Sequence, residues 1–315
     1  MDAIVDDAAL MPKEAALRTL RAAVTAYNAE RPKVAREMRM RLLLIFGSYL
    51  LLAGFLARMA LTRFEMNWFG IVLVFLALGG GVVWQFAVAP AKRFQQALRD
   101  RMLPLVFGFV EGVRYAHGGT PGFMDGMPGK DFVPRDRSVH GDMIAGAHEG
   151  LVFTLAETEL STGSGKSRQT TFNGVIFHFA REEVFPGLLL AARRPNALRR
   201  FMRDLFGGSG LAPVTSGNPE VDASHEFRTD RPDAATPLVQ GTLAKALDYL
   251  ATEWRDDVVR IALRGRDCYL LVPTRKDFFE LPPLDTAIDF DRHIRPMIRD
   301  LVTLLATAHL VNKIG

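Results

Sequence analysis

Two long apolar runs stand close together near the start of the chain, whereas polar and apolar positions are mixed elsewhere. Leu42–Ala57 (LLLIFGSYLLLAGFLA) holds no charged residue, and Met59–Leu61 extends it beyond Arg58 to about 20 residues. Trp68–Ala91 (WFGIVLVFLALGGGVVWQFAVAPA) is also uncharged. Because a helix rises about 1.5 Å per residue and the hydrocarbon core is about 30 Å thick, each run is long enough to cross a membrane. The pattern predicts two transmembrane helices.

The segment between the two runs, Thr62–Asn67, is so short that the helices must form a tight antiparallel hairpin. Arg58 lies near a helix end, where its side chain can reach the lipid headgroups. Trp68 and Trp84 lie near the ends of the second run, and aromatic residues favour the membrane interface. A pair of core helices in a soluble protein and a cleaved signal peptide are the alternatives. Two adjacent uncharged runs that begin about 40 residues into the chain fit neither of them well.

The second run contains three consecutive glycines, Gly79–Gly81. Small residues in a membrane helix let another helix approach closely. We expect this patch to pack against the first span, and a contact between copies of the chain is the alternative.

Basic residues flank the two runs unequally. The connecting segment and its border offer only Arg58 and Arg63, offset in part by Glu65. Because positive charge accumulates on the cytoplasmic side, both termini are expected there. The basic residues on the expected cytoplasmic side are Arg31, Lys33, Arg36, Arg39, Arg41, Lys92, Arg93, Arg99 and Arg101.

The segments next to the spans show helical periodicity. Residues 7–40 carry apolar positions at spacings of three and four, which predicts a helix that docks on the rest of the protein or on a partner. Pro32 is expected to break this helix just before the basic residues. After the second span, the helix is expected to continue from Lys92, with a kink at Pro104.

The remainder predicts a mixed α+β domain. β-branched and aromatic residues mark strands at Gly150–Leu160 and Thr170–Ala180. Two further segments, residues 258–263 and 268–273, predict a hairpin whose turn contains Gly265. The other expected elements are strands at 184–192 and 225–230, helices at 195–206, 237–254 and 289–313, and a loop at 207–220.

These elements give a fold class of α+β, with a transmembrane helical hairpin followed by a cytoplasmic mixed domain. The expected domains are residues 1–40 (N-terminal helix and basic residues), 41–91 (hairpin) and 92–315 (α+β domain). A subdomain boundary is expected near 207–222, where glycine, serine and proline accumulate.

Composition agrees with this division. The mean hydropathy of the 315 residues is +0.09 although 23% of them are charged. These two values agree if the apolar residues are concentrated in a few segments. The single cysteine, Cys268, excludes an internal disulfide and lies in an apolar run, so we expect a buried side chain. A net charge of +4 does not indicate nucleic-acid binding.

The string Gly163-Ser-Gly-Lys-Ser167 resembles the end of a phosphate-binding loop. That loop needs a further glycine five positions before Gly165, where this chain has Leu160, and a helix directly after it. The residues that follow, from Thr170 on, are typical of a strand. The sequence therefore predicts a turn between two antiparallel strands, and no bound nucleotide.

Histidine and acidic residues are densest in VHGDMIAGAHEG. Imidazole and carboxylate groups suit a metal or acid–base site, but no helix-spaced pair fixes a geometry. Glycines within the segment favour turns at strand ends, so we expect surface polar residues, no metal and no cofactor. The alternative is a catalytic or metal site formed by His140, Asp142, His148 and Glu149. Glu157 and Glu159 share one strand face, which we expect to be an exposed edge.

A basic cluster falls on the helix expected at 195–206. In a domain held at the inner leaflet, such a helix can contact anionic headgroups, at about 1 kcal/mol per charge. An ordinary solvated face is the alternative. The residues are Arg193, Arg194, Arg199, Arg200 and Arg203.

The order of motifs resembles the bacterial two-pass membrane proteins of domain-of-unknown-function family 3137. The matching segments begin after the second span with KRFQQALRDRMLPLV and continue through VRYAHGG, RDRSVHGDMIAG and FTLAETEL. TTFNGVIFHFAREEVFPGLLL is similar to the family's Phe-x-Gly signature with a second glycine, and VDASHEFRTD precedes a helix as in the family. Pro237-Leu-Val differs from the family's helix start. The resemblance implies a membrane hairpin with a cytoplasmic domain and transfers no catalytic residue.

These observations favour a non-enzymatic module, anchored in the membrane by two helices, that binds a protein partner or the anionic lipid surface. A membrane-bound enzyme with a site around His140–Glu149 is the first alternative. A structural subunit of a membrane complex, or a homo-oligomer formed through Gly79–Gly81, is the second.

Overall fold

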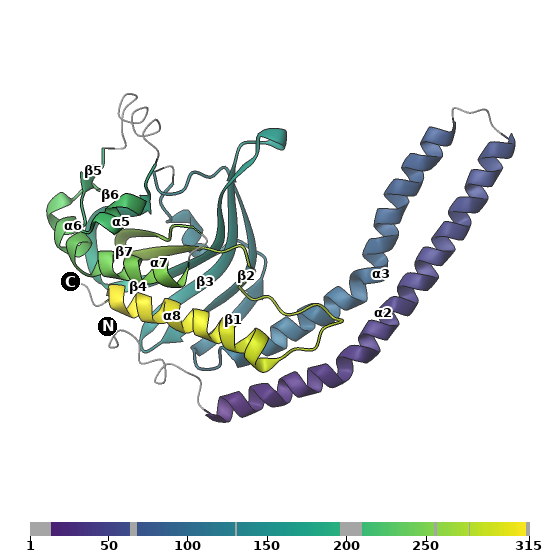
Figure 1. The fold of residues 1–315 in the computed structure, drawn as a ribbon, viewed down its shortest axis with the longest axis horizontal. Helices are drawn as coiled ribbons and strands as arrows, with labels where there is room; N and C mark the ends of the chain where they lie inside the picture. The colour runs from purple at the N-terminus through teal and green to yellow at the C-terminus, as the bar shows by residue number, and fades with distance from the viewer. Residues whose placement is uncertain are drawn as a thin grey trace. The chain divides into compact units, whose positions relative to one another are not determined.

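The computed structural model describes residues 14–63, 68–129, 131–195, 210–254, 257–276 and 278–312, with backbone alone for 60–63, 68–78, 83, 87, 90 and 91. The chain divides into two compact units. Of the described residues, the helical unit contains 17–105 and 281–293, and the sheet unit contains 14–16, 106–280 and 294–312. Figure 1 shows the elements of both units along the chain.

The helical unit is built on α2 (Glu14–Arg63) and α3 (Trp68–Val106). The predicted break at Pro32 is wrong, because α2 runs through this proline without interruption. A proline inside a helix lowers its stability by about 3 kcal/mol. Tertiary contacts that α2 makes before and after Pro32 offset that loss here. Tyr27 stacks on Phe94 of α3 at 5.4 Å, and Ala35 packs with Leu284. The predicted continuation of the second helix from Lys92 is confirmed.

α2 and α3 run antiparallel. Val34 and Met38 of α2, which precede the first apolar run, pack in the same cluster as Val88 and Phe94 of α3. Further along, a side chain at Gly79 would lie 2.8 Å from the Tyr49 hydroxyl. The expectation that the glycine patch packs against the first apolar run is therefore confirmed for Gly79.

Residues 281–293 belong to the helical unit and bind α2. The side-chain amide of Asn28 donates to the Ile288 carbonyl at 2.8 Å and accepts from the Ile288 N–H at 2.9 Å. Arg31 donates to the Leu284 carbonyl at 3.0 Å, and Arg21 lies over the Phe290 ring. The expectation that the N-terminal helix docks on the rest of the protein is therefore confirmed for residues 281–293.

One helix in the described part of the chain is long and apolar enough to cross a membrane. It comprises Glu14–Met59 of α2, and its most apolar window has a mean hydropathy of 1.9. Only 6% of that window is buried inside the protein.

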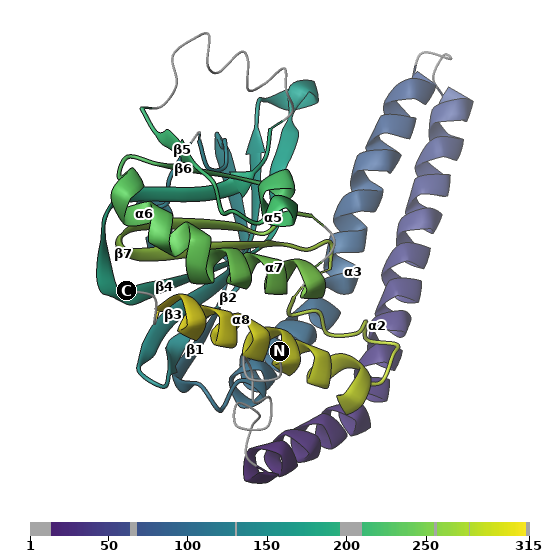
Figure 2. The same cartoon turned by 60° about the vertical axis from the view of Figure 1, so that its left-hand side comes forward.

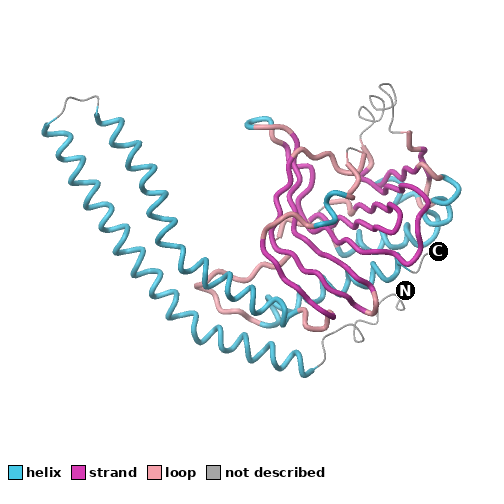
Figure 3. Tube along the Cα trace, turned by 180° about the vertical axis from the view of Figure 1, so that it is seen from behind, coloured by secondary structure: helices cyan, strands magenta, loops and turns pink. Residues whose placement is uncertain are grey.

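Within its described residues, the sheet unit contains seven strands that pair antiparallel throughout. The order is β1-β2-β3-β4-β6-β5, and β7 also pairs with β4. Figure 3 shows the strands from behind. Their bounds are β1 Glu111–His117, β2 Arg137–His148, β3 Leu151–Thr162, β4 Gln169–Arg193, β5 Ala212–Val214, β6 His225–Thr229 and β7 Arg260–Pro273.

β4 organises the sheet because it is long enough to pair with three strands. β3 and β6 lie along one edge of β4 at opposite ends, and β7 follows the other edge from Gly174 to Ala191. The predicted hairpin around Gly265 is wrong, since residues 260–273 form one strand. Both halves pair with β4 instead of with each other, and Gly265 lies in a bulge with φ 60°.

The strands predicted at 150–160, 170–180 and 225–230 are confirmed, and residues 184–192 form the second half of β4. The short 3-10 turn η2 (Gly165–Ser167) joins β3 to β4, so the predicted turn in the glycine-rich string is also confirmed. The predicted helix 195–206 and the start of the loop 207–220 lie outside the described residues.

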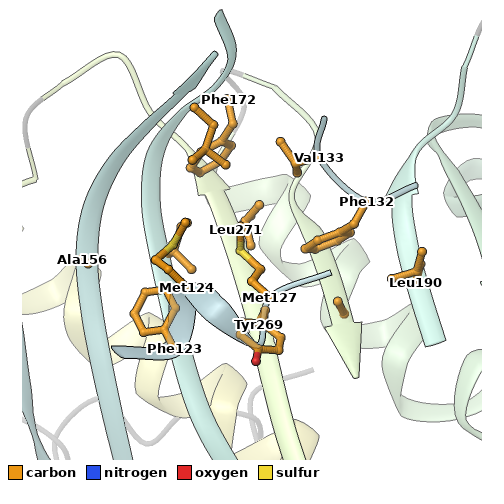
Figure 4. Close-up of a cluster of buried hydrophobic side chains, with 13 residues drawn as sticks. Phe123, Met124, Met127, Phe132, Val133, Ala156, Phe172, Leu190, Tyr269 and Leu271 are labelled. Atoms are coloured by element: carbon orange, nitrogen blue, oxygen red, sulfur yellow. The ribbon is translucent and has the colours of Figure 1, made fainter. Parts of the chain in front are cut away.

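Helices α7 (Ala244–Glu253) and α8 (Arg295–Asn312) lie over one face of the sheet (Figures 1 and 2). The opposite face is covered by residues 121–129 and 131–135, which include the 3-10 turn η1 (Gly122–Asp125). Phe123 and Phe132 of that segment pack with Ile176, Tyr269 and other strand residues (Figure 4). The remaining helical elements are α5 Pro219–Ser224, α6 Pro232–Leu238, η3 Val239–Leu243 and η4 Phe290–Ile294. The predicted α+β class is confirmed.

Candidate functional site

The structure separates the four residues of the sequence-predicted site into three places. β2 runs without a turn from Arg137 to His148, so the expected turns at Gly141 and Gly146 are wrong and His140 is distant from His148. The ring of His140 contacts the hydroxyls of Thr158 and Ser138 at 3.0 and 3.1 Å. Burial lowers the pKa of His140, which favours its neutral form.

Asp142 lies at the centre of a buried polar group. Its side chain is 1% exposed, and the Tyr115 hydroxyl donates to it at 2.6 Å. Nδ1 of His117 contacts the same carboxylate oxygen. The three residues are together because His117 pairs with Asp142, and Tyr115 with Ile144, across β1 and β2.

This arrangement gives His117 a defined ring orientation. A carboxylate that accepts from Nδ1 fixes the tautomer and leaves Nε2 as the acceptor. The His117 side chain is 49% exposed, so a solute can reach it. The pair therefore has the parts of an acid–base group, and its histidine is one that sequence reasoning missed.

Glu157 is not on an exposed edge, which corrects the expectation for this residue. It lies on β3, between β2 and β4, and its carboxylate accepts from the backbone N–H groups of Phe278 and Phe279. Glu159 is exposed and accepts from the Thr170 hydroxyl. A cavity of about 330 Å³ next to these carboxylates is also lined by Asn173, Arg275 and Lys276.

The third place joins the β2–β3 turn to the C-terminal helix. Nδ1 of His148 lies 3.2 Å from Nε2 of His309, in the last turn of α8. The Glu149 carboxylate lies 4.0 Å from the same His309 nitrogen. One ligand atom of each residue lies within 4.8 Å of the others, a geometry in which a metal ion can be held. Sequence reasoning found His148 and Glu149 and missed His309, which is 161 residues away.

The described members of the arginine cluster are bound to the protein. Arg193 pairs with Asp257 at 3.0 Å, and Arg194 donates to the Asp222 carbonyl. Arg199, Arg200 and Arg203 lie outside the described residues. Cys268 is buried as predicted, and burial raises the pKa of its thiol, so it is unreactive.

A family model described as "Protein of unknown function (DUF3137)" matches residues 170–313. This match supports the family that the motifs of the sequence resemble, over the stretch from the start of β4 to the end of α8. Comparison with curated proteins and with solved structures finds no match to the chain.

The two glycines of the family-like signature have structural roles. A side chain at Gly174 would collide with the backbone of Val272 and Thr274 in and after β7. A side chain at Gly187 would occupy the place of the Asp230 carboxylate, which accepts from the Leu188 N–H at 2.7 Å. The signature therefore marks two places where β4 is closely approached, by the β7 backbone at Gly174 and by the Asp230 side chain at Gly187.

Proposed function

We propose that the protein is a two-pass membrane protein with both termini in the cytoplasm of a bacterium. Its α+β domain is a binding module held at the cytoplasmic face of the inner membrane. The module acts on the anionic membrane surface through basic residues, and its role is not catalytic.

The exposed apolar surface of α2 is the observation that carries this proposal. Leu51 is 78% exposed and Leu43 is 68% exposed, and their neighbours on the helix are also uncovered. Fully burying one such side chain is worth about 1.5–3 kcal/mol, so this surface is strongly unfavourable in water. The exposed large apolar residues of this stretch are Met40, Leu43, Leu44, Phe46, Leu50, Leu51, Leu52, Phe55, Leu56 and Met59.

The antiparallel register of α2 and α3 supports the orientation. Because Met38 packs in the same cluster as Val88 and Phe94, the basic residues before the first apolar run lie level with Lys92 and Arg93. The side chains of Arg36, Arg39, Arg41, Lys92 and Arg93 are exposed. We call these five residues the basic band. On the cytoplasmic leaflet, each of its charges contributes about 1 kcal/mol of attraction to anionic lipid.

The contacts of the Asp142 and Glu157 carboxylates support a binding module rather than an enzyme. Asp142 holds Tyr115 and His117 on β1, and Glu157 holds the backbone after β7. Both carboxylates fasten segments of the sheet unit to each other. A loop that is fixed in this way presents a constant surface to a partner.

Cysteine accessibility tests the topology. Cys268 is buried, so the natural chain gives a low background with a membrane-impermeant thiol reagent. We expect Ser164→Cys, in the exposed β3–β4 turn, to react only when the cytoplasmic face is accessible. Glu65→Cys, between the two apolar runs, should react only from the opposite face. Labelling of both variants from the same face, or release of the protein by alkaline extraction, contradicts the proposal.

Photo-crosslinking tests the binding partner. A photoreactive residue in place of Arg199 is expected to give lipid adducts that increase with the anionic lipid content of the membrane. The same residue in place of Lys166, in the β3–β4 turn, is the control position. Adducts to another protein in place of lipid adducts would show that the module binds a protein partner instead.

A further inference from the structure

We propose that His148, Glu149 and His309 bind a divalent transition metal ion, for which zinc is the best match, and that this ion fastens the end of α8 to the β2–β3 turn. The proposal concerns a site that the membrane-surface role does not use. A negative result for the metal site would therefore leave the membrane-surface role unaffected, and the reverse also holds.

The separation of the two imidazoles fits a shared metal ion. Zinc binds histidine nitrogen at 2.0–2.1 Å, and two ligands at a tetrahedral angle are then about 3.3 Å apart. Nδ1 of His148 and Nε2 of His309 are 3.2 Å apart. The rings are inclined at 64°, and their centroids are 5.4 Å apart, so the two nitrogens approach each other without stacking of the rings.

Both histidines are held in place by the surrounding fold. His148 is buried at the end of β2, with its ring edge-on to Phe109. The end of α8 is fixed by Asn312, whose amide accepts from the Glu182 N–H at 2.8 Å and donates to the Glu182 carboxylate at 3.2 Å. The two nitrogen donors are thus presented by a strand and a helix that contact the same sheet.

The backbone of Glu149 points to a use for its carboxylate. Glu149 and Gly150 form the two-residue turn between β2 and β3, with φ of 48° and 81°. Such turns favour asparagine, aspartate or glycine, because a positive φ strains other residues by about 1 kcal/mol. Glu149 is the single non-glycine residue with a positive φ in the described part of the chain. A longer carboxylate at this position can reach an ion between the two rings.

The composition of the donor set indicates the class of metal. Two imidazoles and one carboxylate are a donor set that zinc binds in proteins, with water in the fourth position. The Glu149 side chain is 69% exposed and that of His309 is 18% exposed, so an ion and a water molecule can enter. Hard cations such as magnesium prefer oxygen ligands alone. The site is therefore specific for a transition metal.

Metal titration of the full-length chain tests this site. The chain is purified in detergent on a tag without histidine, stripped with a chelator, and titrated with zinc or magnesium in a calorimeter. We expect one zinc ion per chain, retained through dialysis and detected by elemental analysis, and no magnesium. Cobalt should give the visible absorption of tetrahedral coordination.

Four variants distinguish a metal site from two hydrogen-bonded histidines. His148→Ala and His309→Gln are expected to weaken zinc binding by more than about 100-fold, since loss of a second-shell partner alone costs about 10–100-fold. Glu149→Gly should weaken zinc binding while it preserves or raises the melting temperature of the metal-free protein, because it relieves the positive φ. His140→Gln, on the same strand, should bind zinc as the natural chain does. If the natural chain retains no zinc, or if the first three variants bind zinc as tightly as it does, the proposal is wrong.

Discussion

The side-chain amide of Asn28 forms two hydrogen bonds with the backbone of Ile288, 260 residues further along the chain. The donated bond is 2.8 Å and the accepted bond is 2.9 Å. The amide therefore satisfies both backbone groups of Ile288, as a neighbouring strand would. This pair attaches residues 281–293 to α2 within the helical unit. The segment connects two parts of the sheet unit, residues 106–280 and α8, and it gives the first half of α2 a second partner besides α3.

Asn28→Ala is expected to release this segment from α2. The substitution leaves the N–H and the carbonyl of Ile288 without their partner, which costs about 1–3 kcal/mol. Hydrogen exchange measured by mass spectrometry should show faster exchange in residues 281–293. Thr25→Ala, three residues earlier on α2, removes only a local bond to the Arg21 carbonyl and is the control. Equal exchange in the two variants would mean that the amide of Asn28 does not hold the segment.

Gly174→Ala is expected to destabilise the sheet unit by about 3 kcal/mol or more. The added methyl group would collide with backbone atoms of Val272, Pro273 and Thr274, which cannot move without disrupting the pairing of β4 with β7. Thermal unfolding measures the effect. Gly122→Ala, at the start of η1, meets no atom within 4 Å and should be nearly neutral. Similar losses of stability in both variants would contradict the argument from close packing.

The sequence predicts local features of this protein well and long-range pairing poorly. The strand-like composition of residues 258–263 and 268–273 predicts both halves of β7. A glycine between them, Gly265, is equally typical of a hairpin turn and of a bulge. Only the length of β4 decides between them, because β4 offers a partner to both halves. In the same way, Pro32 predicts a helix break, yet contacts with Phe94 and Leu284 keep α2 continuous.

The candidate metal site also depends on a long-range contact that the sequence does not predict. His148 and Glu149 are adjacent in the sequence and were found as a dense group of polar residues. His309 is on the helix that the sequence predicts at 289–313, but the sequence does not indicate which strand end that helix reaches. Asp142 was grouped with His140 because they are close in sequence, whereas the pairing of β1 with β2 gives it Tyr115 and His117 instead.

Asp300→Asn is expected to stabilise the protein at neutral pH. Burial, opposed by Arg299 and reinforced by Glu253, raises the pKa of Asp300 from 3.8 to about 6. Because the folded state holds this proton more tightly, the contribution of Asp300 to stability is full below pH 3.8 and is lost as the pH rises through about 6. Above that pH the charged carboxylate costs about 1–3 kcal/mol, which asparagine avoids.

Melting temperatures of the natural chain and the Asp300→Asn variant between pH 4 and 7 check this prediction. The difference should be largest at pH 7 and should disappear toward pH 4. Asp248→Asn, on the exposed side of α7, is the control and should show no comparable trend. A constant difference over the whole range would indicate a change in packing instead of a change in protonation.

The glycine patch of α3 allows a direct test of hairpin packing against self-association. Gly79→Leu places a side chain where the Tyr49 hydroxyl lies, 2.8 Å from the new Cβ atom, and should separate α2 from α3 at a cost of about 1–3 kcal/mol. A Cβ atom at Gly81 meets no atom within 4 Å, so we expect the hairpin itself to tolerate Gly81→Leu. Thermal unfolding in detergent should therefore show a lower melting temperature for Gly79→Leu alone. Light scattering then measures the mass of the particle, and a smaller mass in Gly81→Leu would show that the outward glycine joins copies of the chain. An unchanged mass in both variants, with the loss of stability confined to Gly79→Leu, would mean that the patch serves the hairpin alone.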